Sequence, residues 1–266
     1  TPGVTTHLIT VATNPPTPGT NILVALAATN QVQAALAQFD QLIATYTNSP
    51  FLGKAHLHRG WCLWLDHKIP ESLPAFMQAT ERLALSEDLA VARFKLADVQ
   101  FQLNDFTNAL RNYQSVVKDF EAFPRVRHTL FDHALYQVLR VSLQLGNLAE
   151  AAEAMRRILD WFPDSAFRDR GMLLVAQGFT HTHQPVEARA LFTDLTKRLP
   201  ESPLIPEVEL AIARTYLQEK QWIGAIAKFT EWLGRPFATN ALRARAEFDR
   251  AWAHYQAGQL TNALTL

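Results

Sequence analysis

The stretch GNLAEAAEAMRRILDWFPDS, residues 146–165, spans the second half of a unit that recurs along the chain. It opens with Gly-Asn, a pair that tolerates the left-handed backbone conformation in which helices end. Ala151, Met155 and Ile158 follow at offsets of four and seven, which share one face of a helix. The stretch closes with FPDS, in which proline stops this helix and aspartate or serine can cap the next one. It therefore predicts one helix between two turns.

The same pattern returns at a nearly constant interval. Anchor residues separated by 37, 37, 42, 37, 37 and 38 positions are Ala35, Ser72, Ala109, Ala151, Ala188, Ala225 and Ala263. Four residues after the first six anchors stand Phe39, Phe76, Tyr113, Met155, Phe192 and Phe229. Twelve residues before the anchors, and small in five of seven cases, stand Leu23, Gly60, Ala97, Leu139, Ala176, Ala213 and Ala251. A small residue there lets two helices approach closely, with the anchor opposite it.

Six of the seven units show a turn-prone step between their two helices. These steps are Thr29-Asn30, Asp66-His67, Asn104-Asp105, Gly146-Asn147, His183-Gln184-Pro185 and Gly258-Gln259. No window of strict alternation suggests a strand. The sequence therefore predicts an all-α protein made of a helical hairpin of about 37 residues, repeated seven times.

This arrangement resembles the tetratricopeptide repeat (TPR) family over roughly residues 20–266. The family pattern has a small residue on the first helix, an alanine on the second, an aromatic four positions later and a proline at the close. The resemblance implies a right-handed α-solenoid of about seven TPR-like hairpins, whose first helices line a concave wall. The period and junctions such as TYTNSPFLGKAH (45–56) are similar to bacterial cell-envelope members: the TPR lipoprotein of outer-membrane assembly and the Tol–Pal-associated protein.

Two boundaries follow from composition and register. Residues 1–17 are rich in threonine and proline, and we expect them to form an irregular linker or lead-in before a solenoid over residues 18–266. Ala263 would begin the second helix of the seventh hairpin, and Leu266 comes before the aromatic of that helix. The last repeat is therefore incomplete, and we expect the natural protein to continue.

Composition narrows the class of protein. The chain is 48% hydrophobic, so it buries a sizeable core, and 25 basic residues balance 25 acidic ones. Because the formal charge is zero, we expect no nucleic-acid partner. The apolar stretch at residues 22–28 is too short to span a membrane, so we expect no membrane insertion of this chain.

The predicted concave wall carries the candidate binding residues. Positions 18, 15, 11 and 8 before each anchor lie on one stripe of the first helix. From that stripe we select Trp61, Trp64, Phe94, Phe101, Tyr136, Arg140, Arg170, Arg214, Arg245 and Trp252. Aromatic side chains and arginine dominate binding hot spots, and arginine can hold a carboxylate with two parallel hydrogen bonds. We therefore expect a groove for an extended or helical peptide segment. The alternative is that the aromatics pack between hairpins and the arginines are solvated or paired.

The interval of 42 between Ala109 and Ala151 places five extra residues near KDFEAFPRVRHTLFDH, residues 118–133. Such an insertion either opens a loop, where function often resides, or lengthens the helix pair, with a local kink at Pro124. Arg125, Arg127 and His128 make this segment a locally basic patch.

We expect neither catalysis nor a cofactor. The motifs HExxH, GxxxxGK[ST], GxGxxG and GxSxG do not occur. The pairs His56/His58 and His181/His183 are two residues apart, which on a helix points them in nearly opposite directions and prevents joint metal ligation. Cys62 lies on an apolar helix, where we expect a buried and unreactive thiol.

The sequence thus favours a non-catalytic scaffold or adaptor that binds a peptide or protein segment, plausibly in a bacterial envelope assembly. Two alternatives stay open. The first is a structural module that associates with copies of itself through the solenoid ends, and the second is the recruiting or regulatory arm of a longer protein. The resemblance to envelope proteins favours the periplasm or cell envelope over the cytoplasm.

Overall fold

The computed structural model describes residues 21–236 and 240–264, and these residues form α-helices and connecting turns without a strand. The expected lead-in over residues 1–17 lies outside the described residues. The chain divides into two compact units, residues 1–83 and 84–266. The helices are α1 (Asn21–Thr45), α2 (Leu52–Leu65), α3 (Ile69–Arg82), α4 (Glu87–Gln102), α5 (Phe106–Asp119), α6 (Pro124–Gln144), α7 (Leu148–Trp161), α8 (Arg168–His181), α9 (Pro185–Arg198), α10 (Ile205–Gln218), α11 (Trp222–Leu233), α12 (Asn240–Gln256) and α13 (Leu260–Leu264).

In the first unit, α2 and α3 form a hairpin and α1 packs against α2. The hairpin predicted around Thr29-Asn30 is wrong, because α1 continues as one helix from Asn21 to Thr45. The physical reason lies in its composition: residues 21–45 contain neither glycine nor proline, and the asparagine at position 30 accepts helical geometry.

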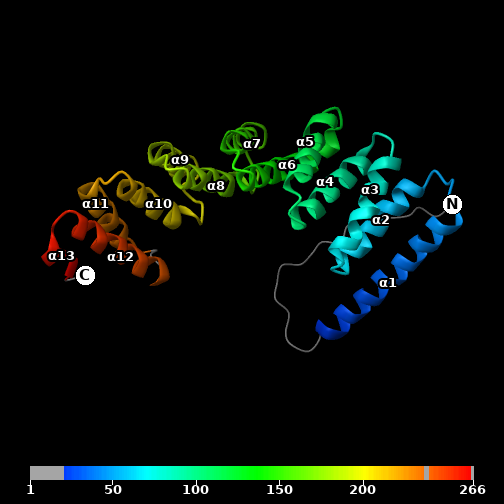
Figure 1. Ribbon diagram of the computed structural model, residues 1–266, viewed down its shortest axis with the longest axis horizontal. Helices are drawn as coiled ribbons and strands as arrows, with labels where there is room; N and C mark the ends of the chain where they lie inside the picture. The colour runs from blue at the N-terminus through cyan, green and yellow to red at the C-terminus, as the bar shows by residue number, and fades with distance from the viewer. Residues whose placement is uncertain (1–20, 237–239, 265–266) are drawn as a thin grey trace. The chain divides into compact units, whose positions relative to one another are not determined.

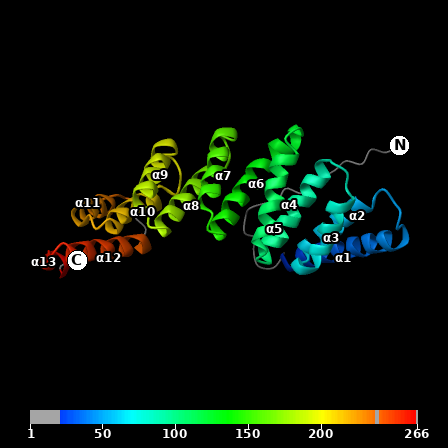
Figure 2. The ribbon, with the colours of Figure 1, turned by 45° about the horizontal axis from the view of Figure 1, so that its top comes forward.

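In the second unit, α4 to α13 form five successive hairpins, each first helix packing against the second helix that follows it (Figures 1 and 2). The first helices also touch one another, α4 with α6, α6 with α8 and α10 with α12. They therefore form one layer and the second helices the other. The predicted α-solenoid of helical hairpins is confirmed.

Each hairpin turns at a residue with a left-handed backbone. The residues with positive φ are His67, Asn104, Gly146, His183, Lys220 and Gly258, each five positions before an anchor. The backbone N–H that follows each of them donates to the carbonyl five residues earlier, as Asp105 does to Gln100 at 2.8 Å. Sequence inspection missed the turn at Lys220, because lysine has no preference for this conformation.

Five of the seven predicted anchors lie in the core, whereas Ala35 and Ala263 are partly exposed. Ser72, Ala109, Ala151, Ala188 and Ala225 are fully buried. The small residue on the first helix does not face the anchor in every hairpin, however. A Cβ built on Gly60 would lie 2.7 Å from the ring of Phe76, the aromatic four residues after the anchor. In that hairpin the small residue makes room for the ring and so sets the close helix spacing.

The five extra residues lengthen α6, which has 21 residues, whereas α8 and α10 have 14 each. Pro124 stands in the first turn of α6, where its missing N–H costs no helical hydrogen bond. The longer helix is therefore confirmed for α6, whereas the kink predicted at Pro124 is wrong because this proline begins the helix.

Replacing Ala188 with leucine should lower the free energy of unfolding by about 1–3 kcal/mol, because the new atoms would overpack a fully buried position. Ala190→Leu is the matched control, two residues along the same helix on its exposed side, and should change it by less than about 0.5 kcal/mol. Urea denaturation followed by circular dichroism measures both. Equal effects would contradict the assignment of the anchor.

Replacing Lys220 with glycine should raise the free energy of unfolding by about 0.5–1 kcal/mol, because φ at this residue is 58° and glycine adopts positive φ without a Cβ clash. The reciprocal change, Gly146→Ala at φ 72°, should lower it by a similar amount. Thermal unfolding of the two variants provides the measurement, and shifts of the same sign would refute this account of the turns.

Candidate functional site

The predicted wall residues divide between the two units. Trp61 and Trp64 lie on α2 of the first unit, where both are half-buried and both interact with other residues. The other eight lie on the first helices α4, α6, α8, α10 and α12 of the second unit. The structure therefore brings Phe101, Tyr136 and Arg140 to the layer of first helices in the second unit. Trp61 and Trp64 belong to the first unit.

Phe94 is part of the interior. Its side chain is 7% exposed and meets the ring of Tyr113 edge to face, with the ring centroids 5.4 Å apart. The equivalent residues Leu173 and Leu210 are also buried. The side chain of Phe94 therefore packs between neighbouring helices. This agrees with the alternative interpretation, in which aromatic residues of the stripe pack between hairpins.

Phe101 and Arg140 form a contact between adjacent first helices. The guanidinium carbon of Arg140 on α6 lies 4.8 Å from the ring centroid of Phe101 on α4, within the range of a cation–π interaction. Nη1 of Arg140 also donates to Oε1 of Gln137 at 2.9 Å. Among the described residues, no carboxylate forms an ion pair with Arg140.

An aromatic platform lies next to this contact. The rings of Tyr136 and Phe167 are stacked, with centroids 4.6 Å apart and an interplanar angle of 15°, and His133 meets Phe167 edge to face. Tyr136 is one helical turn from Arg140, and Phe167 is the N-cap residue of α8. The stripe positions did not include Phe167, because this residue precedes the first turn of α8. The sequence signal that could have identified it is an aromatic residue directly before a helix.

The arginines of the wall differ in what they can offer. Arg214 and Arg245 both bind Asp249, at 2.7 and 3.4 Å, and this carboxylate is almost fully buried. Arg170 on α8 is exposed and takes part in no ion pair among the described residues. The predicted row of four arginines thus contains two that balance an internal charge, whereas Arg140 and Arg170 have no carboxylate partner.

We call Phe101, Tyr136, Arg140, Phe167 and Arg170 the wall patch. It combines aromatic rings with two unpaired guanidinium groups over α4, α6 and the start of α8. A protein segment with apolar side chains and carboxylates would match this chemistry.

Trp252 lies apart from the wall patch, on α12. Its ring stacks on Tyr255 with centroids 5.5 Å apart, and Phe248 stands one turn earlier. The exposed fractions of Phe248, Trp252 and Tyr255 are 66%, 48% and 55%. This α12 stripe is a second aromatic surface.

A buried polar group lies behind the wall patch. The hydroxyl of Tyr113 on α5 donates to Oδ1 of Asp98 on α4 at 2.6 Å, and Nζ of Lys95 donates to the other oxygen at 2.8 Å. Burial, followed by the neighbouring charge of Asp98 and this hydrogen bond, raises the pKa of Tyr113. The phenol therefore stays protonated and fixes the side of α4 that carries Phe101.

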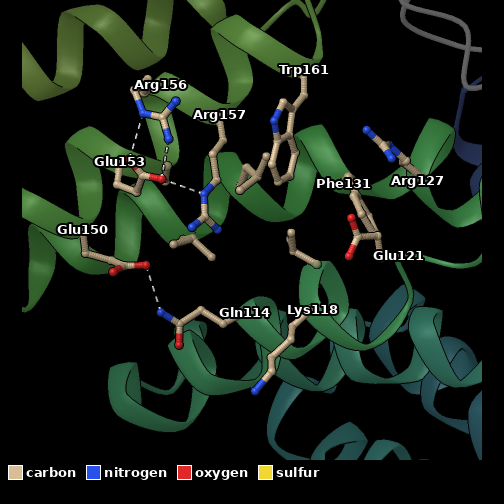
Figure 3. A pocket seen from close by; sticks show the side chains of 14 residues that line it. Gln114, Lys118, Glu121, Arg127, Phe131, Glu150, Glu153, Arg156, Arg157 and Trp161 are labelled. Carbon is tan, nitrogen blue, oxygen red and sulfur yellow. Dashed lines mark hydrogen bonds and ion pairs between the residues drawn. The ribbon is translucent and has the colours of Figure 1, made fainter.

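A cavity of about 570 Å³ lies on the other layer, between α5, α6 and α7 (Figure 3). It coincides with the junction at which the repeat is five residues longer, and Arg127 of the predicted basic patch lines it. Arg125 instead pairs with Glu87 at 3.3 Å. The basic segment thus contributes one arginine to a cavity and one to the surface.

The described residues contain no group of three histidine, cysteine, aspartate or glutamate side chains that could hold a metal ion. In the same part of the chain, no helix combines the length and apolarity that crossing a bilayer requires. Cys62 is buried, and burial raises the pKa of its thiol, so it forms the reactive thiolate less readily.

Comparison with known proteins agrees with this architecture. Residues 94–166 match the family model described as tetratricopeptide repeat. No curated protein sequence matches the chain. The repeats and the solved structures similar to this one support a protein–protein interaction scaffold.

Three crystal structures illustrate the similarity. A TPR protein from Cytophaga hutchinsonii is 15% identical with a TM-score of 0.65, over 91% of this chain and 90% of that one. A tetratricopeptide repeat protein from Parabacteroides merdae is also 15% identical, with a TM-score of 0.54 over 90% and 86%. YrrB, described as a TPR protein with an unusual peptide-binding site, is 13% identical, with a TM-score of 0.53 over 79% and 97%. The predicted resemblance to the tetratricopeptide repeat family is therefore confirmed, by the family model over residues 94–166 and by the fold shared with these structures.

Replacing Tyr113 with phenylalanine should lower the free energy of unfolding by about 1.5–3 kcal/mol, because a hydrogen bond to a buried charged group is lost. Tyr255→Phe is the control, since that residue is exposed. The raised pKa adds a second test: wild type should lose stability as the pH rises above about 10, the ordinary tyrosine pKa, because the unfolded chain ionises first. Tyr113→Phe should lose less over that range in urea titrations.

Proposed function

We propose that this tetratricopeptide-repeat chain is a non-catalytic scaffold that binds an extended or helical segment of another protein on the wall patch. The supporting observation is the position of Arg140, whose guanidinium lies 4.8 Å from the Phe101 ring centroid and pairs with no carboxylate among the described residues. Because the ring and Gln137 hold this side chain, little conformational entropy is lost when it binds a carboxylate.

The neighbouring residues determine which segment fits. The stacked rings of Tyr136 and Phe167 favour an apolar or aromatic side chain, and the exposed Arg170 favours a second carboxylate. We therefore expect an acidic segment that contains at least one aromatic residue. The peptide-binding site for which YrrB is described supports a peptide ligand in a protein of this fold.

The remaining predicted contact residues differ in how well the structure supports them. Trp61 and Trp64 lie in the first unit, and their contact with a partner stays a prediction. Arg214 and Arg245 contribute less than expected, because binding a partner carboxylate would compete with Asp249. A place in a bacterial envelope assembly, and the periplasm as compartment, stay predictions from the resemblance of the repeat junctions.

The α12 stripe favours an alternative, in which copies of the chain associate through Phe248, Trp252 and Tyr255. Light scattering as a function of concentration distinguishes the two functions. A monomer that binds peptides supports the scaffold, whereas reversible oligomers that Trp252→Ala abolishes support self-association.

The scaffold function can be tested with random dodecapeptides displayed on phage and selected on the whole chain. Synthetic versions of the enriched peptides should bind Arg140→Ala and Arg170→Ala at least about tenfold more weakly than wild type, since each loses a charged hydrogen-bond donor. Isothermal titration calorimetry measures the dissociation constants.

The matched control is Arg111→Ala on the second helix α5, which removes an exposed arginine outside the wall. It should leave affinity unchanged, and circular dichroism should show that all three variants fold. Enriched peptides that lack acidic residues, or that bind the wall variants as tightly as the control, would refute the proposal.

A further inference from the structure

The cavity between α5, α6 and α7 has an apolar floor. Phe131, Leu135 and Val138 line it from α6, Val117 from α5 and Ala154 from α7. All five are buried in the core, so they are positioned by packing in the free protein. A volume of about 570 Å³ over such a floor is that of a ligand site.

One wall of the cavity is a tryptophan between two arginines. The guanidinium carbons of Arg127 on α6 and Arg157 on α7 lie 5.8 and 5.7 Å from the ring centroid of Trp161. Both distances allow cation–π attraction, which fixes the indole beside the opening. The side chain of Trp161 is nevertheless 42% exposed, so part of its surface is available to a ligand (Figure 3).

One of the two carboxylates on the α7 side, that of Glu153, is already paired with arginine. Glu153 accepts hydrogen bonds from Arg156 at 2.8 and 2.9 Å and from Arg157 at 2.9 Å. These two guanidinium groups lower the pKa of Glu153 to about 2, so it stays ionised and paired. Glu150 accepts a hydrogen bond from Gln114 at 3.0 Å.

On the α5 and α6 side the balance is positive. Lys118 and Arg127 line the cavity, and neither has a carboxylate partner among the described residues. Glu121 is the acidic residue that lines this side. The cavity thus presents two cations with unused N–H donors beside an apolar floor and a tryptophan, which is the complement of an aromatic group next to a carboxylate.

We infer that this cavity is a second binding site, distinct from the wall patch, for an acidic peptide segment of a partner protein. An aromatic side chain of the segment lies on the floor formed by Phe131, Leu135 and Val138, against Trp161. A neighbouring carboxylate accepts hydrogen bonds from Lys118 and Arg127. The site exists at this junction because the additional turn of α6 supplies Arg127.

The test removes the wall patch first, so that the two sites are separated. Random dodecapeptides displayed on phage are selected on the full chain carrying Arg140→Ala and Arg170→Ala. We expect enrichment of peptides with an aromatic residue beside aspartate or glutamate. The affinities of synthetic peptides should fall about tenfold in Arg127→Ala and in Lys118→Ala, the size typical of a charged contact residue.

Arg125→Ala is the matched control, because Arg125 stands two residues before Arg127 on the same turn of α6 but is 77% exposed and pairs with Glu87. It should leave the affinity unchanged. Glu121→Gln should tighten binding, because it removes a repelling charge beside the two cations. Circular dichroism identifies a variant that does not fold, in which case Arg127→Gln replaces Arg127→Ala.

No enrichment on the wall variant, enrichment of peptides without the acidic and aromatic pair, or equal affinities for the variants at positions 125 and 127 would each overturn the inference. Because the selection uses a chain without the wall arginines, failure here leaves the wall patch untouched. The result for the wall patch does not decide the result for the cavity, because the cavity is tested by its own selection.

Discussion

The close contact between the two helices of each hairpin is the constraint on which the structure depends. Where the anchor is alanine or serine, the second helix presents almost no side chain at its crossing point, and the following aromatic ring fills the space above a small residue such as Gly60. Larger residues at these points would push the helices apart, and the seam that joins one hairpin to the next would lose its register. The repeated small residues thus allow close spacing of the two helices in the hairpins that carry them.

This constraint also decides which wall residues can bind. The stripe chosen from spacing is wide enough to include both the open face of a first helix and the seam with its neighbour. Phe94, Leu173 and Leu210 lie in that seam and are buried, whereas Arg140, four residues after the position equivalent to Phe94, is only half-buried. Asp249 then removes Arg214 and Arg245 from consideration by binding both. The arginines of the predicted wall that pair with no carboxylate among the described residues, Arg140 and Arg170, thus form a short patch and not a continuous row.

Much of the fold could be predicted from the sequence because it depends on local rules. The anchors, the aromatics and the turns repeat in fixed register, and buried Ala188 and Ala225 follow from that register alone. The turn at Lys220 could not be predicted, since lysine has no preference for the left-handed backbone that this residue adopts. The candidate site was harder still: Arg140 and Phe101 are 39 positions apart, and Arg214 and Asp249 are 35 positions apart. Spacing within one helix carries no information about such partners.

The longer interval between Ala109 and Ala151 gives one junction a chemistry that the regular repeats do not have. A regular repeat buries the same surface at every junction, so it gives every junction the same chemistry. Five additional residues change one junction alone: α6 gains a turn, Arg127 reaches Trp161 on α7, and a cavity with an apolar floor lies between α5 and α7. A solenoid can therefore acquire a second site through an insertion that leaves its core contacts unchanged, which is why the insertion, more than the repeats themselves, distinguishes this chain from a uniform array.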